Sequence, residues 1–533
     1  MSPTSPAGSP GNSGGAWAPL RRPLFRTLWL ATLVSGIGSW MHEVGAGWLM
    51  ITLGAGPVQV ALVQAATALP VFLLALPAGA LADILDRRRF LIAAQAWTAL
   101  VAATLAGLTW AGLVDARTLL VLAFLLACGT AMMTPAWAAT LPELVPRDEL
   151  QAAIALNSTG INVARAIGPA VAGVIVATAG PAPVFAVNAA SFLCVIVVLV
   201  RWRREPAVTA MRGERFLGAM RAGVRYVRET PALQRVMVRA TGFFLFASSL
   251  WSLLPLVARD LPGGGSTTYG LLLACLGAGA VGGALVLPRL RRRFSREVVV
   301  RAATLLFALA AAAVAAASSL AWAVPPMLAA GLAWIAALSS FHLAAQNAVA
   351  GWVKARALAV YLVTFAAGMA AGSVLWGALA ARFGVPAALA IGAAGAVAAM
   401  LALWRVPVGT DEPASAMAPA SWPAPVVSSD IEPDRGPVLI TVDYDVDPAD
   451  GDAFRQAMDR LARVRRRDGA MSWGLFEDAA QPGAFRETFV VESWAEHERQ
   501  HHRATQSDLA LAATARAFHR GSSPPRVGHF IGT

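Results

Sequence analysis

The stretch "GALADILDRRRF" (residues 79–90) ends a long apolar segment with acidic residues and arginines, and a related stretch, "GALVLPRLRRRF", follows at residues 283–294. Three pairs of glycines share the offset between these copies: Gly79 and Gly283, Gly168 and Gly372, and Gly173 and Gly377. Because these markers lie at matching helix ends, one shared offset indicates a duplication rather than chance. The sequence therefore predicts two related halves.

The composition around these stretches is that of a membrane protein. Hydrophobic residues make up 57% of the 533 residues and charged residues only 14%, whereas a soluble protein of this size needs more surface charge. Apolar runs close to the roughly 20 residues of a membrane-spanning helix lie at 27–53, 58–81, 90–114, 118–141, 150–179, 181–200, 236–258, 269–288, 298–320, 322–345, 357–381 and 385–404. We predict an all-α membrane protein with twelve transmembrane helices in two six-helix repeats, the pattern of parallel transporter halves.

Loop arginines predict how this bundle lies in the membrane. The connections on the side of the N-terminus carry Arg21, Arg22, Arg26, Arg87–Arg89, Arg147, nine arginines between 201 and 235, five between 289 and 296, Lys354 and Arg356. The opposite loops carry Arg117, Arg259 and Arg382. Because basic loops stay on the cytoplasmic side, we expect both termini in the cytoplasm. The single lysine among 43 basic residues suggests a bacterial source, and hence a bacterial inner (plasma) membrane.

The net charge of +12 does not indicate nucleic-acid binding, because it belongs to the membrane part. Residues 436–533 contain 12 arginines and 14 acidic residues. The cysteines Cys128, Cys194 and Cys275 lie apart in apolar stretches and indicate neither a disulfide framework nor a metal site. The sequence predicts no cofactor.

The chain divides into six segments. We expect a disordered N-terminal tail, a first six-helix half, a basic cytoplasmic loop with an amphipathic helix in "RFLGAMRAGVRYVRE", a second six-helix half, a linker and a small α+β domain. Their bounds are 1–20, 21–200, 201–235, 236–405, 406–436 and 437–533.

The stretch at 79–90 resembles the signature loop between the second and third helices of the major facilitator superfamily. Gly79, Asp83, Arg87 and Arg88 occupy the matching positions, and Asp86 stands where the family has a glycine. The resemblance implies a conformational latch between Asp83 and an arginine at the helix end. The second copy has Leu287 where the acid would be, so we expect the latch to be asymmetric.

Two further stretches narrow the resemblance. "ALNSTGINVARAIGPAVAG" (155–173) resembles the Gly-Pro motif of drug–proton antiporters through Gly168, Pro169 and Gly173, and "WVKARALAVYLVTFAAGMAAGSVLWG" (352–377) resembles the transmembrane secretion effector subgroup that includes the enterobactin exporter. The resemblance implies a transporter that exports a small molecule, such as a siderophore, drug or secondary metabolite, by alternating access. An importer on the same fold, or an exporter whose C-terminal domain modifies its cargo, is the alternative.

One carboxylate lies inside a predicted span, in "GSWMHEVGAGW" (38–48). Glu43 is about 24 Å along its helix from residue 27, and Arg165 about 23 Å from residue 150, so similar depths are expected. The superfamily fold has the first and fifth helices adjacent. Glu43 and Arg165 are therefore candidates for a buried pair, either proton-sensitive or a permanent structural ion pair. His42 points about 100° away and is expected to be hydrogen-bonded within the bundle.

Other polar residues within the spans are candidates for the substrate cavity. We single out Gln64, Asn157 and Asn162, because an uncharged polar side chain inside a span needs a partner.

The C-terminal segment alternates strands and helices in the order β-α-β-β-α-β, which is the ferredoxin-like pattern. Strands are expected in "PVLITVDYDV", "AMSWGLFED", "AFRETFVVESW" and "PRVGHFIG", and helices over 448–469 and 495–519. The domain resembles the antibiotic-biosynthesis-monooxygenase type of dimeric α+β barrel, which implies self-association through the sheet. "HERQH" (497–501) matches a zinc-protease pattern, but the small domain offers neither the cleft nor the third ligand. We predict no metal site and no catalytic residue.

Overall fold

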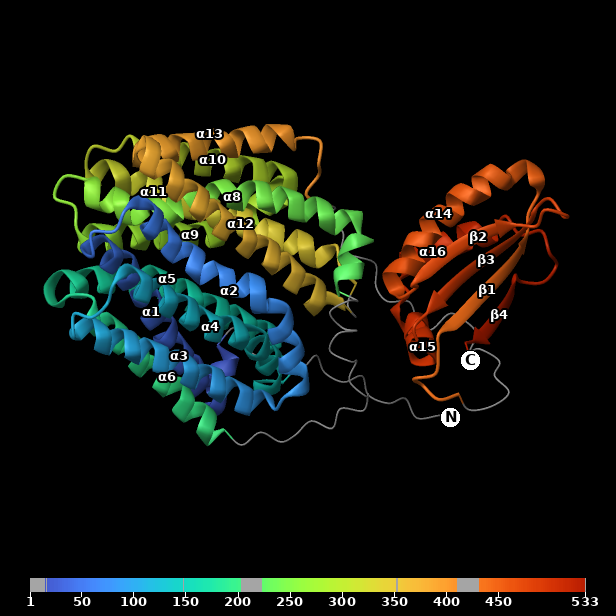
Figure 1. Ribbon diagram of the computed structural model, residues 1–533, viewed down its shortest axis with the longest axis horizontal. Coiled ribbons are helices and arrows are strands. Elements are labelled where there is room, and N and C mark those ends of the chain that lie inside the picture. Colours follow the sequence, from blue (N-terminus) through green and yellow to red (C-terminus); the bar gives the residue numbers. More distant parts are fainter. Residues whose placement is uncertain are drawn as a thin grey trace, which may run out of the picture. The chain divides into compact units, whose positions relative to one another are not determined.

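The computed structural model describes residues 15, 17–146, 148–202, 223–350, 353–409 and 431–532 (Figure 1). The chain forms two compact units. The first unit comprises Met1–Gly213, Val238–Phe341 and Leu362–Val406, and the second comprises Glu214–Met237, His342–Tyr361 and Pro407–Thr533. The first unit contains most of the helical part, and the second contains the C-terminal sheet.

Twelve helices of 18–30 residues lie between Pro23 and Ala402 in the described chain. They are α1 (Pro23–Thr52), α2 (Pro57–Ile84), α3 (Arg87–Trp110), α4 (Ala116–Leu144), α5 (Leu150–Ala179), α6 (Ala182–Arg201), α8 (Pro231–Asp260), α9 (Ser266–Arg293), α10 (Arg296–Ala315), α11 (Leu320–Asn347), α12 (Lys354–Phe383) and α13 (Val385–Ala402). Each of the twelve apolar runs coincides with one of these helices. Eleven of the helices are long and apolar enough to cross a membrane, and α1, which carries His42 and Glu43, is not among them.

Residues at the helix ends explain why the helices start where they do. The Asp86 carboxylate accepts a hydrogen bond from the backbone N–H of Arg89 at 2.8 Å and caps α3. Asp115 caps α4 in the same way through Thr118. The sequence analysis counted only the apolar residues of each run. Many of the helices are longer than the apolar runs, because polar residues at the ends of the runs continue the helix.

The helices alternate in direction, so the bundle has two ends. We call the end that carries Arg22, Arg87–Arg89 and Arg289–Arg293 the arginine-rich end, and the end that carries Arg117, Arg259 and Arg382 the arginine-poor end. Helices α1, α3 and α5 run from the arginine-rich to the arginine-poor end, and α2, α4 and α9 run the other way.

The two halves of the bundle have different cores. The first half packs small residues such as Ala31, Ala136 and Ala153 around Phe25 and Leu28. The second half holds an aromatic cluster with ring centroids 4.7–6.4 Å apart, formed by Phe243, Phe244, Phe307, Trp334, Phe341 and Phe365. Offset and edge-to-face ring contacts of this kind stabilise a core beyond the area they bury.

The C-terminal part forms a four-stranded antiparallel sheet in the order β2-β3-β1-β4. Its elements are β1 (Val438–Asp445), α14 (Gly451–Asp468), β2 (Ser472–Glu477), β3 (Ala484–Val491), α15 (Trp494–Arg503), α16 (Gln506–Arg516) and β4 (Arg526–Ile531). The expected order of strands and helices is present, with one difference. The second helical stretch is two helices, because Thr505 caps a new helix by accepting from the backbone N–H of Asp508.

Alternate residues of β1 and β3 face the helices and are buried, including Val442, Tyr444 and Phe485. They pack against Phe454 and Met458 of α14. The second unit also includes the segment before α8: Arg225 forms an ion pair with Glu496 at 3.6 Å, and Tyr226 Oη accepts from the backbone N–H of Ala350 at 3.0 Å.

Several expectations concern residues outside the described part of the chain. They include most of the N-terminal tail, the amphipathic segment "RFLGAMRAGVRYVRE" up to residue 222, and linker residues 410–430. The end of the expected disordered tail is described, and Ala18–Arg21 forms a short 3-10 helix there.

Candidate functional site

Helices α1 and α5 pack closely because small residues face each other (Figure 1). A Cβ atom added to Gly36 would lie 3.2 Å from the Cβ of Ala164, and one added to Gly168 would lie 2.7 Å from the Cβ of Trp40. The indole N–H of Trp29 donates to the Leu156 carbonyl at 3.0 Å. These contacts fix the register of the two helices.

This register offsets the two charged candidates along the helix axis. Since Gly168 faces Trp40, Arg165 lies about one turn nearer the arginine-rich end and Glu43 about one turn nearer the arginine-poor end. At 1.5 Å per residue their Cα atoms are roughly 9 Å apart along the axis. The sequence analysis predicted similar depths because it counted from residue 27, whereas α1 begins at Pro23.

Arg165 and Glu43 interact through space and not through a direct bond in this arrangement. The Arg165 guanidinium carbon lies 5.2 Å from the centroid of the Trp40 ring, and its Nε and Nη1 have no hydrogen-bond partner among the described residues. Within the described chain no hydrogen bond or ion pair ends on the Glu43 carboxylate. Cation–π contact with Trp40 is what holds Arg165 here.

Helix α9 of the second half closes against α5 near the arginine-poor end (Figure 1). The Ser266 hydroxyl donates to the Gly173 carbonyl at 3.2 Å, and a Cβ on Gly270 would meet the Gly173 Cα at 2.8 Å. Further along, a Cβ on Gly277 would meet the Arg165 carbonyl at 2.7 Å. Of the Gly-Pro motif, Gly168 thus contacts α1, and Gly173 contacts the other half of the molecule.

Tyr269 of α9 is a residue of this region that the sequence analysis missed. Its side chain is 4% exposed, and its hydroxyl lies 2.9 Å from the position of a Cβ on Gly47 of α1. The sequence does single out this residue: the chain has only four tyrosines, and Tyr269 lies in an apolar run.

His42 differs from its expected state. Neither ring nitrogen has a hydrogen-bond partner among the described residues, and the ring packs on Phe185 with centroids 4.8 Å apart. Asn188 lies one turn after Phe185 on α6, and both polar atoms of its side chain are also buried without a partner among the described residues. The expected hydrogen bond of His42 within the bundle is absent from this arrangement, since α6 presents an aromatic ring to it.

The three cavity candidates do not lie at one level. Gln64 is seven residues from the start of α2 at the arginine-poor end, whereas Asn157 is seven residues from the start of α5 at the opposite end. With helices of 28–30 residues, these positions are roughly 20 Å apart along the bundle. The Asn162 amide donates to the Ser158 carbonyl of its own helix at 2.9 Å.

The arginines of the signature loop bind partners within the first half. Arg87 forms an ion pair with Glu143 at 2.6 Å, and Arg88 donates to the carbonyls of Leu199 and Val200 at the end of α6. The Asp83 side chain and the surroundings of Gly79 lie outside the described part. The arginines therefore tie α3 to the ends of α4 and α6.

A second missed residue is Arg239 of α8, which is 4% exposed although it lies within an apolar run. It donates to Glu297 of α10 at 2.9 Å and to the Leu403 carbonyl at 2.9 Å. Glu297 also pairs with Arg301. This cluster joins α8, α10 and the end of α13.

The C-terminal domain contains a fully paired buried carboxylate. Glu487 of β3 is 0% exposed and accepts hydrogen bonds from Arg465 at 3.0 Å, the Trp473 indole at 3.0 Å and Tyr444 Oη at 3.4 Å. Burial raises the pKa of Tyr444, and the Glu487 carboxylate raises it further. Burial alone would lower the pKa of Arg465, but Glu487 makes the net shift upward.

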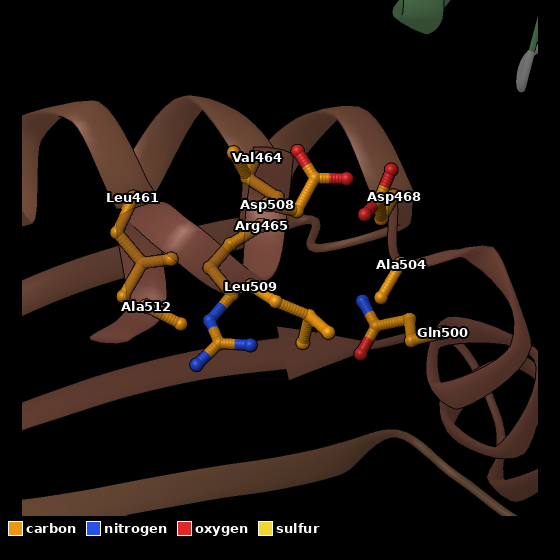
Figure 2. Close-up of a pocket in the computed structure, with 9 residues that line it drawn as sticks. All are labelled: Leu461, Val464, Arg465, Asp468, Gln500, Ala504, Asp508, Leu509 and Ala512. Carbon is orange, nitrogen blue, oxygen red and sulfur yellow. The ribbon is translucent and has the colours of Figure 1, made fainter. Parts of the chain in front are cut away.

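Beside this network, α14, α15 and α16 enclose a cavity of about 30 Å³. Figure 2 shows the Arg465 guanidinium and the Gln500 amide on either side of Leu509. The Gln500 Nε2 atom is buried without a partner among the described residues. A cavity of this volume holds one or two water molecules, so it does not accommodate an organic substrate.

The zinc-like pattern lies on α15. His497 is 1% exposed and packs against the rings of Trp494 and His529, with centroids 5.4 and 4.7 Å away. The side chain of His501 lies outside the described part. His497 is therefore a member of the domain core in this structure.

Comparison with known proteins identifies relatives of the membrane part. The chain is 25% identical over 279 residues to the Staphyloferrin A transporter of Staphylococcus aureus (strain NCTC 8325 / PS 47), which covers 51% of this chain and 69% of that protein. It is 28% identical over 297 residues to the Multidrug efflux pump Tap of Mycolicibacterium fortuitum, which covers 54% of this chain and 71% of that pump.

Solved structures show the same fold at lower identity. A bacterial homolog of the human lysosomal transporter Spinster has a TM-score of 0.56 at 16% identity and covers 73% of this chain and 95% of its own. A POT family transporter in complex with a thioalcohol-conjugated peptide has a TM-score of 0.60 at 13% identity and covers 72% and 95%.

A family model for transmembrane secretion effectors matches residues 14–533. The helical bundle, the eleven apolar helices and the transporter relatives agree with this match. The chain belongs to the transmembrane secretion effector family and is a multi-pass membrane transporter of the major facilitator type.

Proposed function

We propose that this transporter exports a small organic molecule from the cytoplasm in exchange for protons, across a bacterial inner (plasma) membrane. The observation that carries the proposal is Glu43. It is the one acidic residue of the described membrane helices that lies more than three residues from a helix end. An ionisable group at that depth is costly and is typical of proton relays and substrate pathways.

The orientation follows from the arginines. The arginine-rich end lies in the cytoplasm, because basic residues are retained there. The closure of α5 against α9 then lies on the outer side, and we infer that this arrangement is closed to the outside. Alternating access requires that this closure open in another step of the cycle.

Twelve membrane crossings in two repeats are part of the proposal. Helix α1 has 30 residues, as does α8, its counterpart in the second half, and α2 and α9 have 28 residues each. The polar residues that make α1 less apolar than the other helices include His42 and Glu43. The lower hydropathy of α1 is therefore explained by polar residues at a functional position. It does not place this helix outside the membrane.

The relatives suggest the class of cargo. One is named as a transporter of a siderophore and another as a multidrug efflux pump. We therefore expect a siderophore, drug or secondary metabolite as the cargo, with Gln64, Asn157 and Asn162 as candidate contacts in different steps of the cycle. Gly79, Asp83, Arg87 and Arg88 are proposed to act as a latch for one conformation.

For the C-terminal domain we propose a ferredoxin-like fold that self-associates through the open face of its sheet. That face carries Phe476 and Phe530, which are 61% and 57% exposed. Phe530 lies beside Leu439, whereas Phe476 lies beside Arg486, which forms an ion pair with Asp443. An exposed apolar sheet face of this kind favours a partner. A second copy of the same sheet is the simplest one.

The test has two steps. Metabolite profiling of cells with and without the protein, in the cells and in the medium, identifies the cargo. With that cargo in proteoliposomes, Glu43→Gln should abolish export driven by a proton gradient and retain exchange of cargo across the membrane. Proton-driven export at the normal rate by Glu43→Gln/Arg165→Met would contradict proton coupling at Glu43 and leave it a structural residue.

A further inference from the structure

The segment that leads into α8 lies against the helices of the C-terminal domain, and both belong to the second unit. Arg225 forms an ion pair with Glu496 of α15 at 3.6 Å. Tyr226 is 2% exposed, and the guanidinium carbon of Arg467 on α14 lies 5.6 Å from the centroid of its ring. An ion pair and a cation–π contact thus hold residues 223–230 on α14 and α15.

A cavity of about 370 Å³ lies beside this contact, and both sides of the contact line it. Glu229 and Pro231 form one wall, just before and at the start of α8. Helix α14 contributes three arginines, and α16 contributes Asp508 and Leu511. Binding sites for small molecules have volumes of roughly 300–1,000 Å³. This cavity therefore accommodates a small organic molecule, whereas the cavity of about 30 Å³ at Arg465 does not.

The three arginines differ in whether their charge is already neutralised. Arg467 forms ion pairs with Asp468 at 2.8 Å and with Asp508 at 2.7 Å. Arg460 and Arg463 are exposed, and among the described residues neither side chain forms a hydrogen bond or an ion pair. Because they are three residues apart on α14, their side chains are neighbours on the helix surface. Two adjacent guanidinium groups at the cavity are thus available to bind an anion.

The geometry of the ion pairs in this domain indicates which anion fits. A carboxylate is planar, and one arginine satisfies both of its oxygens: Arg467 donates to Oδ1 of Asp468 at 2.8 Å and to Oδ2 at 3.0 Å. A phosphate monoester offers three strong acceptor oxygens, so it accepts from several guanidinium groups at once. The pair Arg460 and Arg463 therefore favours phosphate. Leu511 lines the same cavity and provides an apolar contact for an organic group attached to the phosphate.

We propose that this cavity binds the phosphate group of a small phosphate ester, either a soluble ester or a lipid headgroup, and that binding fastens the C-terminal domain to the start of α8. The phosphate binds Arg460 and Arg463, and the attached group contacts the wall before α8. Because the ester contacts both sides, its binding free energy adds to that of the Arg225 and Tyr226 contacts. The amount of ester then sets how firmly the domain holds the entry to a helix of the transporter.

Glu229 is the carboxylate of the wall before α8. Among the described residues its side chain forms no ion pair, although it lines the cavity together with the arginines. A free carboxylate there repels a bound phosphate. Glu229→Gln should therefore strengthen binding, whereas Arg460→Gln and Arg463→Gln should weaken it. None of these residues belongs to the proposed proton site, so the two proposals stand or fall separately.

The experiment uses the full chain in dodecyl maltoside, a detergent without phosphate. Hydrogen exchange of the amides of residues 224–229 measures how firmly the segment before α8 is held, first with increasing glycerol 3-phosphate and then with increasing phosphatidylglycerol. We expect one of these two esters to slow the exchange, and the concentration of half-maximal slowing gives its apparent affinity. Slowing by glycerol 3-phosphate identifies a soluble ester as the ligand, and slowing by phosphatidylglycerol alone identifies a lipid headgroup.

Arg460→Gln and Arg463→Gln should each raise the half-maximal concentration about tenfold, the factor expected for a lost hydrogen bond to a charged group. Glu229→Gln should lower it about threefold, because a repulsion between partly exposed charges is removed. Arg466→Gln is the matched control, since Arg466 is an exposed arginine of the same helix that lies outside the cavity. Unchanged exchange of the β1 and β3 amides shows that each variant is folded.

Three results would contradict the proposal. If neither ester slows the exchange, the cavity is not a phosphate site. If Arg463→Gln and Arg466→Gln have equal effects, the ester responds only to the general positive charge of α14. If the arginine variants weaken binding and Glu229→Gln leaves it unchanged, the ester binds the domain without reaching the segment, and the link to α8 is wrong.

Discussion

Two glutamates illustrate how differently the C-terminal domain and the membrane bundle use a carboxylate that is withdrawn from water. Glu487 in the sheet is completely buried and accepts hydrogen bonds from Arg465, Trp473 and Tyr444. Glu43 in α1 has Arg165 and Tyr269 nearby, yet within the described chain neither contacts it directly. The Glu487 carboxylate is fully hydrogen-bonded in this structure. Among the described residues, the Glu43 carboxylate makes no direct bond to Arg165 or Tyr269.

The same contrast holds for several other buried polar groups, although Gln500 Nε2 of the C-terminal domain is also buried without a partner among the described residues. In the C-terminal domain Asp508 accepts from Arg467 and Thr505, and Arg503 donates to Glu496 and to the Asp468 carbonyl. In the bundle, polar atoms of His42, Arg165 and Asn188 are buried without partners in the described part. A buried group that is left unpaired costs stability. We infer that the bundle tolerates this cost because these groups change partners during transport.

The largest effect should follow from breaking the Glu487 network. Glu487→Ala leaves Arg465 buried without a counter-charge, and we expect a loss of about 3–5 kcal/mol in the free energy of unfolding of the C-terminal domain. Hydrogen exchange of the β1 and β3 amides in the full chain measures it. Glu477→Ala is the control, because the Arg455–Glu477 pair is exposed and should contribute less than about 1 kcal/mol. Equal losses would show that the buried Glu487 network contributes no more to stability than an exposed ion pair.

A smaller effect is expected at the closure between α5 and α9. Gly270→Ala inserts a Cβ against the Pro169 carbonyl and the Gly173 backbone, which should destabilise the closed arrangement by about 1–3 kcal/mol. Ser266 lies at this contact and is 4% exposed, so the rate of thiol labelling at Ser266→Cys, in the chain with the three native cysteines replaced by serine, should rise accordingly. Gly282→Ala on the same helix is the control, since its Cβ would meet nothing within 4 Å. Unchanged labelling in Gly270→Ala would mean that α5 and α9 do not form the outer closure.

The third effect is a pH dependence of the C-terminal domain. Burial lowers the pKa of His529 below its ordinary 6.5, so the unfolded chain takes up a proton before the folded one as the pH falls below about 6.5. Stability should therefore decrease as the pH falls from 7 to 5, by less than about 1.4 kcal/mol per pH unit. The amide exchange above, repeated at several pH values, measures this slope, and His529→Phe should reduce it. The same slope in both proteins would exclude His529 as its source.

The smallest effect is expected for the stability of the bundle when Glu43 is neutralised. Glu43→Gln removes no direct bond seen among the described residues, so the free energy of unfolding should change by at most about 0.5 kcal/mol while proton-driven export is lost. Thermal unfolding in nanodiscs tests it. Glu297→Gln, which weakens the pair with the buried Arg239, should lower stability more. A loss of several kcal/mol in Glu43→Gln would make Glu43 a structural residue.

Much of the fold could be predicted from the sequence, because the signals are local. Residues 150–179 were predicted as one helix and form α5 with the same bounds. In the C-terminal domain the alternation in "PVLITVDYDV" predicted β1, whereas the break between α15 and α16 depends on a side-chain cap at Thr505. The site was predicted only in part. Glu43 and Arg165 were identified by their charge. Tyr269 carries no charge and was not identified.

The sequence by itself determined the membrane class, the approximate positions of the long helices, and the presence of a carboxylate in α1, because hydropathy and charge are properties of each residue. The tertiary structure alone decided that Arg165 lies on Trp40 rather than on Glu43, and that Tyr269 of the other half reaches Gly47. These contacts depend on helix register, which small residues such as Gly168 and Gly270 fix through close packing. Register joins residues that are far apart in the chain, so no local pattern in the sequence specifies it.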